Sequence, residues 1–344
     1  MVWMADFWVA SPTPDLPVLV LAIVAAAYLA DLVTGKRTPN ALPALPTIVV
    51  LAALMTALRP TAVALAGALV ATAIATTVIR KRPLKPAPVA SSAILAAALA
   101  GAVIARDRML TGWLQYPLSV YAFDVPWRAP NPDGLREATL GFARDPENWQ
   151  QATEGWNWVG PWTARLPQQW EPWWILGALI AAIALLTIKA TGNRRSGALV
   201  VVGAPFAVAA VLWWAISPPA LRFGWGPLFG ITAVMLGWGL WRARQQTLAV
   251  FAVAAGITVI AVVASVTRLD WTSPRETDNW LGIPYEVVPL PTPSTSEFVT
   301  DSGLILRVPT ETDQCWSVYP LCTPDTTSDV ELLLTEVSSG FARQ

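Results

Sequence analysis

The sequence predicts a mainly α-helical membrane protein: a polytopic bundle of about eight spans, with a Trp-rich external loop and a small external β unit near the C-terminus. Of its 344 residues, 54% are hydrophobic and only 13% are charged, and the mean hydropathy is +0.48. These values lie outside the usual range of a soluble domain. The apolar residues also form runs of about 20, the length that a helix needs to cross the hydrocarbon core of a bilayer.

Eight apolar runs are long enough to be predicted as spans. They cover residues 16–34, 41–58, 61–79, 88–106, 173–191, 197–216, 224–241 and 246–266. Only Arg59 and Pro60 join the second run to the third, which predicts a tight connection between neighbouring helices. Pro43 and Pro46 disturb the start of the second run, because a proline inside a helix removes a backbone hydrogen bond.

These runs divide the chain into four regions. The regions are an N-terminal arm with spans one to four (1–106), an external Trp-rich loop domain (107–172), spans five to eight (173–266), and an external C-terminal β unit (267–344).

Positive charges occupy alternate loops and predict the orientation of the helices. Basic residues cluster at Lys36–Arg37, Arg80–Lys85, Lys189–Arg195 and Arg242–Arg244, whereas the opposite short loops hold only Arg59 and Arg222. Basic loops tend to stay in the cytoplasm. The sequence therefore predicts a protein of the cell inner (plasma) membrane with both termini and the loop domain on the extracytoplasmic side.

The distribution of tryptophan agrees with this orientation. All of the 19 tryptophans except Trp238 and Trp241 lie in segments, or at span ends, that are predicted to be outside. Indole rings favour the membrane interface, where the ring is half buried and the N–H stays hydrated. We therefore expect an aromatic outer surface.

The composition excludes several kinds of chemistry. The chain has no histidine and two cysteines, so Ser-His-Asp or Cys-His catalysis and His-ligated metal centres cannot be built from it. Its net charge is zero, which gives no reason to expect a nucleic-acid partner. We expect neither a metal nor a cofactor, and any chemistry must come from carboxylates, Arg, Lys, Tyr, Trp and the backbone.

The loop domain is too long for a simple connection. It carries seven tryptophans, which argue against disorder: Trp113, Trp127, Trp149, Trp156, Trp158, Trp162 and Trp170. Within it, the sequence Asn-Pro-Asp-Gly at 131–134 predicts a turn, and residues 135–144 predict a short helix.

The tail is predicted to fold as a three-stranded β unit after a proline-rich linker at 283–293. Its strands are expected at 298–300, 304–308 and 330–337, with a turn at 301–303 between the first two. Cys315 and Cys322 lie in this unit. On an oxidising face of the membrane they are predicted to form a disulfide, whereas two free thiols would fit an inverted orientation.

Several motifs on the predicted outer face resemble one poorly characterised family of bacterial multi-pass membrane proteins related to the C-superfamily (GT-C) glycosyltransferases. The motifs are Thr111–Leu118 (TGWLQYPL), Phe123–Pro130 (FDVPWRAP), Trp158–Trp162 (WVGPW), Pro218–Phe223 (PPALRF), Asp313–Trp316 (DQCW), Pro320–Pro324 (PLCTP) and Gly340–Phe341. They follow the family's order from about residue 107 to the end. In the motif Pro218–Phe223 the chain has Ala220 where the family usually carries Asp, and it is expected to be shorter than the family at its N-terminus.

This resemblance implies the transfer of a sugar from a polyprenyl-phosphate donor to an extracytoplasmic glycan or lipid acceptor. The expected partners are membrane lipid, a polyprenyl-phosphate-linked sugar and the acceptor. Such a reaction needs a carboxylate base near the acceptor hydroxyl and cationic groups that hold the phosphate, and it requires no histidine.

The expected catalytic residues are Asp124 and Asp107. The expected substrate-binding residues are Arg222, Arg108, Arg128, Trp127, Trp158 and Trp162. A guanidinium contacts a phosphate through two hydrogen bonds, and indole rings stack on sugar faces. Structural roles remain open for each: an interfacial arginine that reaches water, a carboxylate that caps a turn, or a tryptophan of the loop's own core.

Two other functions remain open from the sequence. One is a truncated, non-catalytic membrane subunit or a glycan-binding relative of these enzymes. The other is a transporter, which is less favoured because such proteins normally carry charges or broken helices at mid-membrane, and few intramembrane charges occur in this sequence.

Overall fold

The computed structural model describes residues 14–35, 42–129, 132–169, 171–187, 196–217, 219–243, 293–310, 322–323, 330–332 and 341–343. The chain divides into two compact units. The helical unit consists of residues 1–103 and 134–269, and the second unit consists of residues 104–133 and 270–344. One boundary between them, at 133/134, falls inside the segment 107–172, which the sequence groups as one loop domain.

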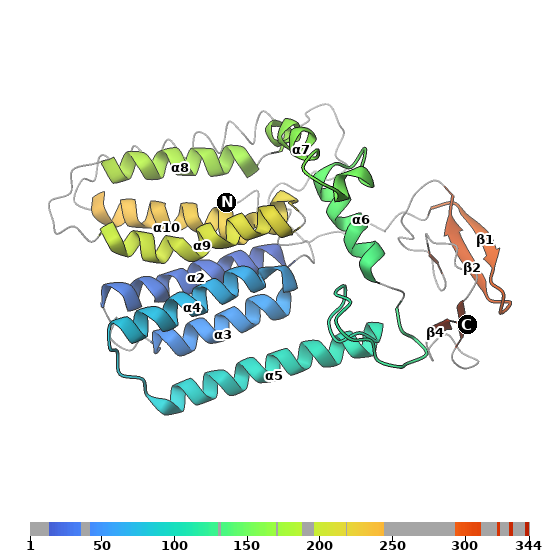
Figure 1. Cartoon of the computed structure of the whole chain (residues 1–344), viewed down its shortest axis with the longest axis horizontal. Helices are drawn as coiled ribbons and strands as arrows, with labels where there is room; N and C mark the ends of the chain where they lie inside the picture. Colours follow the sequence, from blue (N-terminus) through green and yellow to red (C-terminus); the bar gives the residue numbers. More distant parts are fainter. Residues whose placement is uncertain are drawn as a thin grey trace, which may run out of the picture. The chain divides into compact units, whose positions relative to one another are not determined.

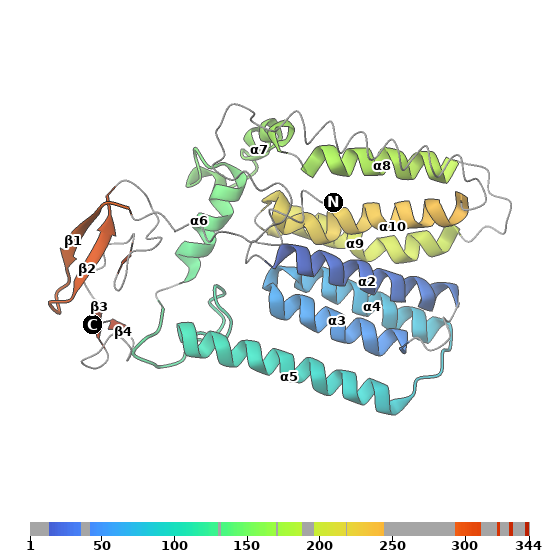
Figure 2. The ribbon, with the colours of Figure 1, turned by 180° about the vertical axis from the view of Figure 1, so that it is seen from behind.

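Parallel and antiparallel helices form the centre of the helical unit. They are α2 (Asp15–Thr34), α3 (Ala44–Leu58), α4 (Val63–Ile79), α8 (Glu171–Thr187), α9 (Ser196–Ile216) and α10 (Trp225–Ala243). These helices lie side by side in Figures 1 and 2. Two short 3-10 turns begin helices of this bundle, η1 (Pro60–Ala62) before α4 and η4 (Leu221–Gly224) before α10.

Five helical segments of the described residues are long and apolar enough to cross a membrane. They are Asp15–Thr34, Pro60–Ile79, Pro86–Thr111, Gly197–Ile216 and Leu221–Trp241. The predicted second span is the shorter apolar helix α3, and the fifth corresponds to α8, which forms a pair bent by 76° with the helix before it. The predicted eighth span, 246–266, lies outside the described residues. The structure is therefore that of a multi-helix membrane protein, and the number of eight spans stays a prediction.

Small side chains bring the central helices close together. On α2, Ala22, Ala25 and Leu29 are fully buried, at the three- and four-residue spacing that puts them on one helical face. On α10, a Cβ at Gly230 would overlap the ring of Phe206 from α9. Without a hydrophobic driving force between helices in lipid, such close backbone approach is a main source of their association.

Helix α5 (Pro86–Thr111) differs from the bundle helices in its exposure. Only 6% of the most apolar 18-residue stretch of this helix is buried inside the protein. Ile94 is 70% exposed. This exposure is consistent with a helix that faces lipid, because many exposed leucine and isoleucine side chains are unfavourable in water.

Helix α6 (Pro132–Arg144) begins earlier than the sequence predicts. The predicted helix at 135–144 is confirmed, but the predicted turn at 131–134 is wrong for residues 132–134, which form the first helical turn. Proline is favoured at the first position of a helix because it has no N–H to leave unpaired, and Asp133 complements the positive end of the helix dipole. Two shorter elements follow, η2 (Gln151–Thr153) and the helix α7 (Val159–Arg165), which continues into η3 (Leu166–Gln168).

The tail contains two separate two-stranded sheets in the described residues. Strand β1 (Thr295–Val299) pairs antiparallel with β2 (Ile305–Pro309), and the predicted turn at 301–303 is confirmed between them. Strand β3 (Val330–Leu332) pairs with β4 (Phe341–Arg343) and not with the hairpin. The prediction of one three-stranded sheet is therefore wrong, because β4, which the sequence did not predict as a strand, supplies the partner.

Candidate functional site

The turn between α9 and α10 gathers contacts from several parts of the helical unit. We call residues 219–225 the α9–α10 turn. The indole N–H of Trp162, in α7, donates to the backbone carbonyl of Pro219 across 2.9 Å. The indole N–H of Trp225 donates to Glu171 Oε1, at the start of α8, across 3.4 Å. The turn thus joins α7, α8 and α10 at one end of the bundle.

A glycine allows the turn to pack closely against α9. A Cβ at Gly224 would lie 2.8 Å from the Trp213 ring, so any larger residue would push the ring away. Trp213 and Trp225 are both buried at this end of the bundle. The aromatic packing therefore fixes the backbone on both sides of Arg222 and Phe223.

Two arginines lie on the ring of Phe223. The guanidinium carbon of Arg59 is 4.3 Å from the ring centroid, and that of Arg222 is 5.0 Å from it. Arg59 follows α3 and is partly buried, whereas Arg222 is exposed. We call these two residues the arginine pair.

The arginine pair has a partial counter-charge. The buried carboxylate of Asp15, in the first turn of α2, forms an ion pair with Arg59, and Arg59 Nε donates to Thr61 Oγ1 across 3.0 Å. Burial, and then the charge of Arg222, lower the pKa of Arg59 from its usual value to about 10. Arg59 therefore stays cationic at neutral pH, and among the contacts of the described residues the arginine pair faces a single carboxylate. This surplus of positive charge favours an anion.

The sequence analysis predicted Arg222 as a binding residue but missed Arg59. A signal for Arg59 was present, because it is the other basic residue in the short loops opposite the cytoplasmic ones. What the sequence did not show was that the ends of α3 and α9 bring both residues to one phenylalanine ring.

Four tryptophans cluster beside the α9–α10 turn. The ring centroids of Trp156, Trp158, Trp162 and Trp214 are separated by 5.5 to 6.4 Å in five pairs. We call them the tryptophan cluster. Its members come from the loop before α7, from α7 and from α9, so the cluster connects the Trp-rich segment to the bundle.

The exposure of the cluster members decides which ring a ligand can reach. Trp158 is only 1% exposed, and the guanidinium of Arg144 covers it at 4.8 Å. This burial fits the alternative of a core tryptophan and leaves no face of Trp158 open to a sugar. Trp162 is partly buried, whereas Trp156 is 62% exposed. Trp156, which the sequence analysis did not single out, is therefore the accessible ring of the cluster.

Two further arginines hold the segment that carries the cluster. Arg144 Nη1 donates to the carbonyl of Ala152 across 3.0 Å, and burial lowers the pKa of Arg144. Arg165 donates to the carbonyls of Ala143 and Arg144. Because these side chains bond to backbone carbonyls, they stabilise the α6–α7 connection.

The other predicted site residues lie in the second unit. Asp107 is buried near the end of α5; its Oδ1 accepts hydrogen bonds from Arg106 Nε at 2.9 Å and Nη2 at 2.7 Å. Its buried Oδ2 has no hydrogen-bond partner within the described residues. Arg108 stacks on Phe123 with a guanidinium-to-centroid distance of 4.8 Å. Asp107 is thus a buried carboxylate with one oxygen that has no hydrogen bond among the described residues.

Three predicted residues belong to the loop after α5. Trp127 is 39% exposed, and its indole N–H donates to the carbonyl of Arg108 across 3.5 Å. Arg128 and Asp124 are exposed. The loop is closed by Gly112, whose positive φ of 72° and close approach to Arg128 leave no room for a side chain. The predicted site residues therefore divide between the units: Trp158, Trp162 and Arg222 in the helical unit, and Asp107, Arg108, Asp124, Trp127 and Arg128 in the second.

A comparison with known protein families assigns the chain to one of them. Residues 1–229 match a family described as a domain of unknown function, DUF8201. The chain belongs to this family. The part of this DUF8201 protein that matches contains the arginine pair, the tryptophan cluster and the whole α9–α10 turn. No curated protein and no solved structure matches the chain, so its function is argued from the site.

Proposed function

We propose that this DUF8201 protein is a glycosyltransferase-like membrane protein that binds a polyprenyl-phosphate-linked sugar at the α9–α10 turn, on the extracytoplasmic side of a plasma membrane. The observation that carries the proposal is the arginine pair. Two guanidinium groups lie on one ring, Phe223, at the end of apolar helices, and their charge exceeds that of Asp15.

The chemistry of the site suits a lipid-linked phosphate better than a soluble anion. Guanidinium groups bind phosphate oxygens in paired hydrogen bonds, and these bonds strengthen where water is scarce. The exposed Arg222 is the first contact for the phosphate, and the half-buried Arg59 is the second. The apolar helices below the turn give the polyprenyl chain a lipid-facing surface along which to lie.

The tryptophan cluster supports a carbohydrate beside that phosphate. The exposed ring of Trp156 offers an apolar face, and its buried neighbours hold it in place. In the proposed reaction an acceptor hydroxyl attacks the anomeric carbon and loses its proton to a carboxylate. The bond between that carbon and the phosphate oxygen breaks, and the arginine pair stabilises the departing phosphate. Asp107 and Asp124, of the second unit, are the carboxylates that the sequence resemblance implies for this role.

A non-catalytic relative that only binds the lipid-linked sugar is the second candidate. The observation that favours it concerns Asp15, the carboxylate that contacts the arginine pair. Asp15 is buried and paired with Arg59, so it is not available as a base.

The test measures the binding of undecaprenyl phosphate to the purified full-length protein in detergent. Arg222→Gln and Arg59→Gln should each weaken binding by roughly ten- to a hundredfold. This is the change in affinity expected when one charge-assisted hydrogen bond is lost. Arg222→Lys should recover part of the affinity, because it keeps the charge but loses the paired geometry. Arg136→Gln, which removes an exposed arginine of α6, is the matched control and should bind like the parent.

Two outcomes separate the proposal from its alternatives. Unchanged binding by a folded Arg222→Gln variant would show that Arg222 only reaches water at the interface, and the phosphate site would be wrong. Binding without transfer of labelled sugar from a polyprenyl-phosphate donor to membrane acceptors would support the non-catalytic relative. Transfer that is lost in Asp107→Asn or Asp124→Asn, with binding intact, would support the enzyme.

A further inference from the structure

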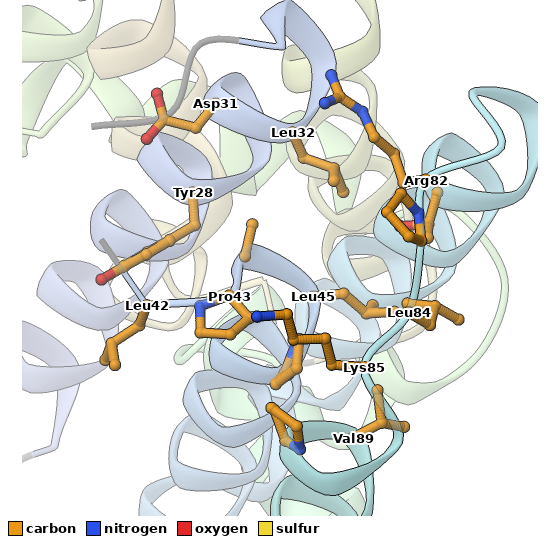
Figure 3. A pocket seen from close by; sticks show the side chains of 15 residues that line it. Tyr28, Asp31, Leu32, Leu42, Pro43, Leu45, Arg82, Leu84, Lys85 and Val89 are labelled. Atoms are coloured by element: carbon orange, nitrogen blue, oxygen red, sulfur yellow. The ribbon is translucent and has the colours of Figure 1, made fainter. Parts of the chain in front are cut away.

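A pocket of about 250 Å³ lies at the other end of the helical unit from the arginine pair. Its lining comes from the end of α2, the start of α3, the end of α4, the connection from α4 to α5 and the start of α5. The lining residues include Tyr28, Asp31, Leu42, Arg82, Leu84 and Lys85. Figure 3 shows these side chains. Helix α2 has 20 residues, so its two ends are about 30 Å apart at 1.5 Å per residue. The pocket is therefore a site of its own.

The end of α4 directs Arg82 toward the pocket. Lys81 adopts a left-handed conformation with φ of 48°, and the backbone N–H groups of Lys81 and Arg82 close the helix by donating to Val78 and Thr77 carbonyls, each across 3.0 Å. This is the hydrogen-bond pattern of a Schellman cap, which usually requires glycine. The backbone therefore reverses at Lys81 and carries Arg82 back to the end of α2.

Arg82 and Lys85 place two cations on the pocket wall. A Cβ at Gly35, which ends α2, would lie 2.6 Å from Arg82 Nη2, so the guanidinium packs directly on the α2 terminus. In Figure 3, Lys85 extends toward Pro43 at the start of α3. Asp31 is the acid of the lining, and Tyr28 adds a hydroxyl. Among its described residues the wall thus carries two cations, one carboxylate and a hydroxyl group.

Most of the remaining lining is apolar, and part of it is exposed. Leu42 is 64% exposed and Leu84 is 53% exposed, whereas Leu45 is buried. A pocket of this size holds a head group but not the acyl chains of a lipid. Exposed leucines at its mouth give an acyl chain a surface to follow out of the pocket.

From this arrangement we infer that the pocket binds the head group of an anionic glycerophospholipid. The phosphate lies between Arg82 and Lys85, hydroxyl groups of the head donate to Asp31 and exchange hydrogen bonds with Tyr28, and an acyl chain covers Leu42 and Leu84. A phosphatidylglycerol-type head fits these requirements, because it combines a phosphate with two free hydroxyls. The inference does not depend on the polyprenyl-phosphate site.

Native mass spectrometry of the full-length protein, released from detergent after titration with phosphatidylglycerol, tests this site. Arg82→Gln and Lys85→Gln should each weaken the tightest lipid-binding event by roughly ten- to a hundredfold. Arg80→Gln is the matched control. It removes a charge from the same basic loop, but Arg80 is exposed and does not line the pocket, so this variant should bind like the parent.

Other arms of the experiment distinguish the source of the phosphate. An excess of inorganic phosphate should not displace the lipid, and Arg222→Gln should leave this binding unchanged. Equal losses in Arg80→Gln and Lys85→Gln would mean a general attraction to anionic lipid and would overturn the inference. Unchanged binding in a folded Lys85→Gln variant, or displacement by inorganic phosphate, would also overturn it.

Discussion

Trp162 donates its indole N–H to the backbone carbonyl of Pro219 across 2.9 Å, and the two residues are 57 positions apart in the chain. This bond joins the Trp-rich segment to the turn that carries Arg222. It places the tryptophan cluster and the arginine pair on the same end of the bundle. A ligand with a sugar next to a phosphate would meet both groups there.

Replacing Trp162 by phenylalanine tests the strength of this link. Trp162→Phe keeps an aromatic ring but leaves the Pro219 carbonyl without its donor. We expect the free energy of unfolding to fall by about 1–2 kcal/mol, measured by SDS denaturation in mixed micelles. Trp156→Phe, at an exposed position of the same cluster, should change it by less than about 0.5 kcal/mol. Equal effects of the two variants would contradict the role of the bond.

The ion pair between Asp15 and Arg59 predicts strong coupling between α2 and the end of α3. Asp15→Asn leaves the half-buried guanidinium without its counter-charge, and we expect a loss of about 3 kcal/mol of stability. Adding Arg59→Gln should recover part of this loss, because the uncompensated charge is then gone. The same denaturation assay measures both variants. If the two losses simply added, the residues would not act as a pair.

Gly230 and Gly237 of α10 allow a matched comparison that tests how tightly α10 packs on α9. A Cβ at Gly230 would overlap the Phe206 ring, whereas a Cβ at Gly237 would meet nothing within 4 Å. Gly230→Ala should therefore destabilise the protein by about 1–3 kcal/mol through overpacking. Gly237→Ala should be neutral or stabilising by up to about 1 kcal/mol, because alanine favours the helix. The reverse order of stability would show that α10 does not pack on α9 in this way.

The predicted orientation of the helices can be tested at opposite ends of the helical unit. In a variant without native cysteines, single cysteines replace the exposed residues Glu154 and Lys81. A membrane-impermeant thiol reagent should label Glu154→Cys in intact cells and Lys81→Cys only after the membrane is opened, because basic loops stay inside. Labelling of Lys81→Cys alone in intact cells would invert the topology.

The predicted disulfide joins Cys322 to Cys315, which lies outside the described residues. Cys322 forms an isolated parallel bridge with Arg307 of β2, so its backbone is tied to the β1–β2 hairpin. Mass spectrometry of the unreduced protein should find one linked peptide pair. Complete alkylation of both cysteines without a reductant would reject the bridge. Its loss should cost no more than about 2–3 kcal/mol, because the closed loop is short.

Much of the helical architecture could be predicted from local sequence. The run at 16–34 is helix α2, and the run at 197–216 is α9. Both could be predicted because a helix needs about 20 apolar residues to cross the hydrocarbon core of a bilayer. The same local logic placed the helix at 135–144 and the turn at 301–303. It did not find the early start of α6, where Pro132 is equally compatible with a turn and with a first helical position.

The composition of the candidate site was decided by tertiary packing. Arg59 and Arg222 follow different helices, and nothing in the sequence between them states that both side chains lie on Phe223. In the same way, Trp158 and Trp156 have similar sequence surroundings, but one is buried and the other is exposed. The length of an apolar run is a property of one segment alone. Burial and charge pairing instead depend on which segments pack together, and this packing depends on the shapes of side chains across the whole bundle.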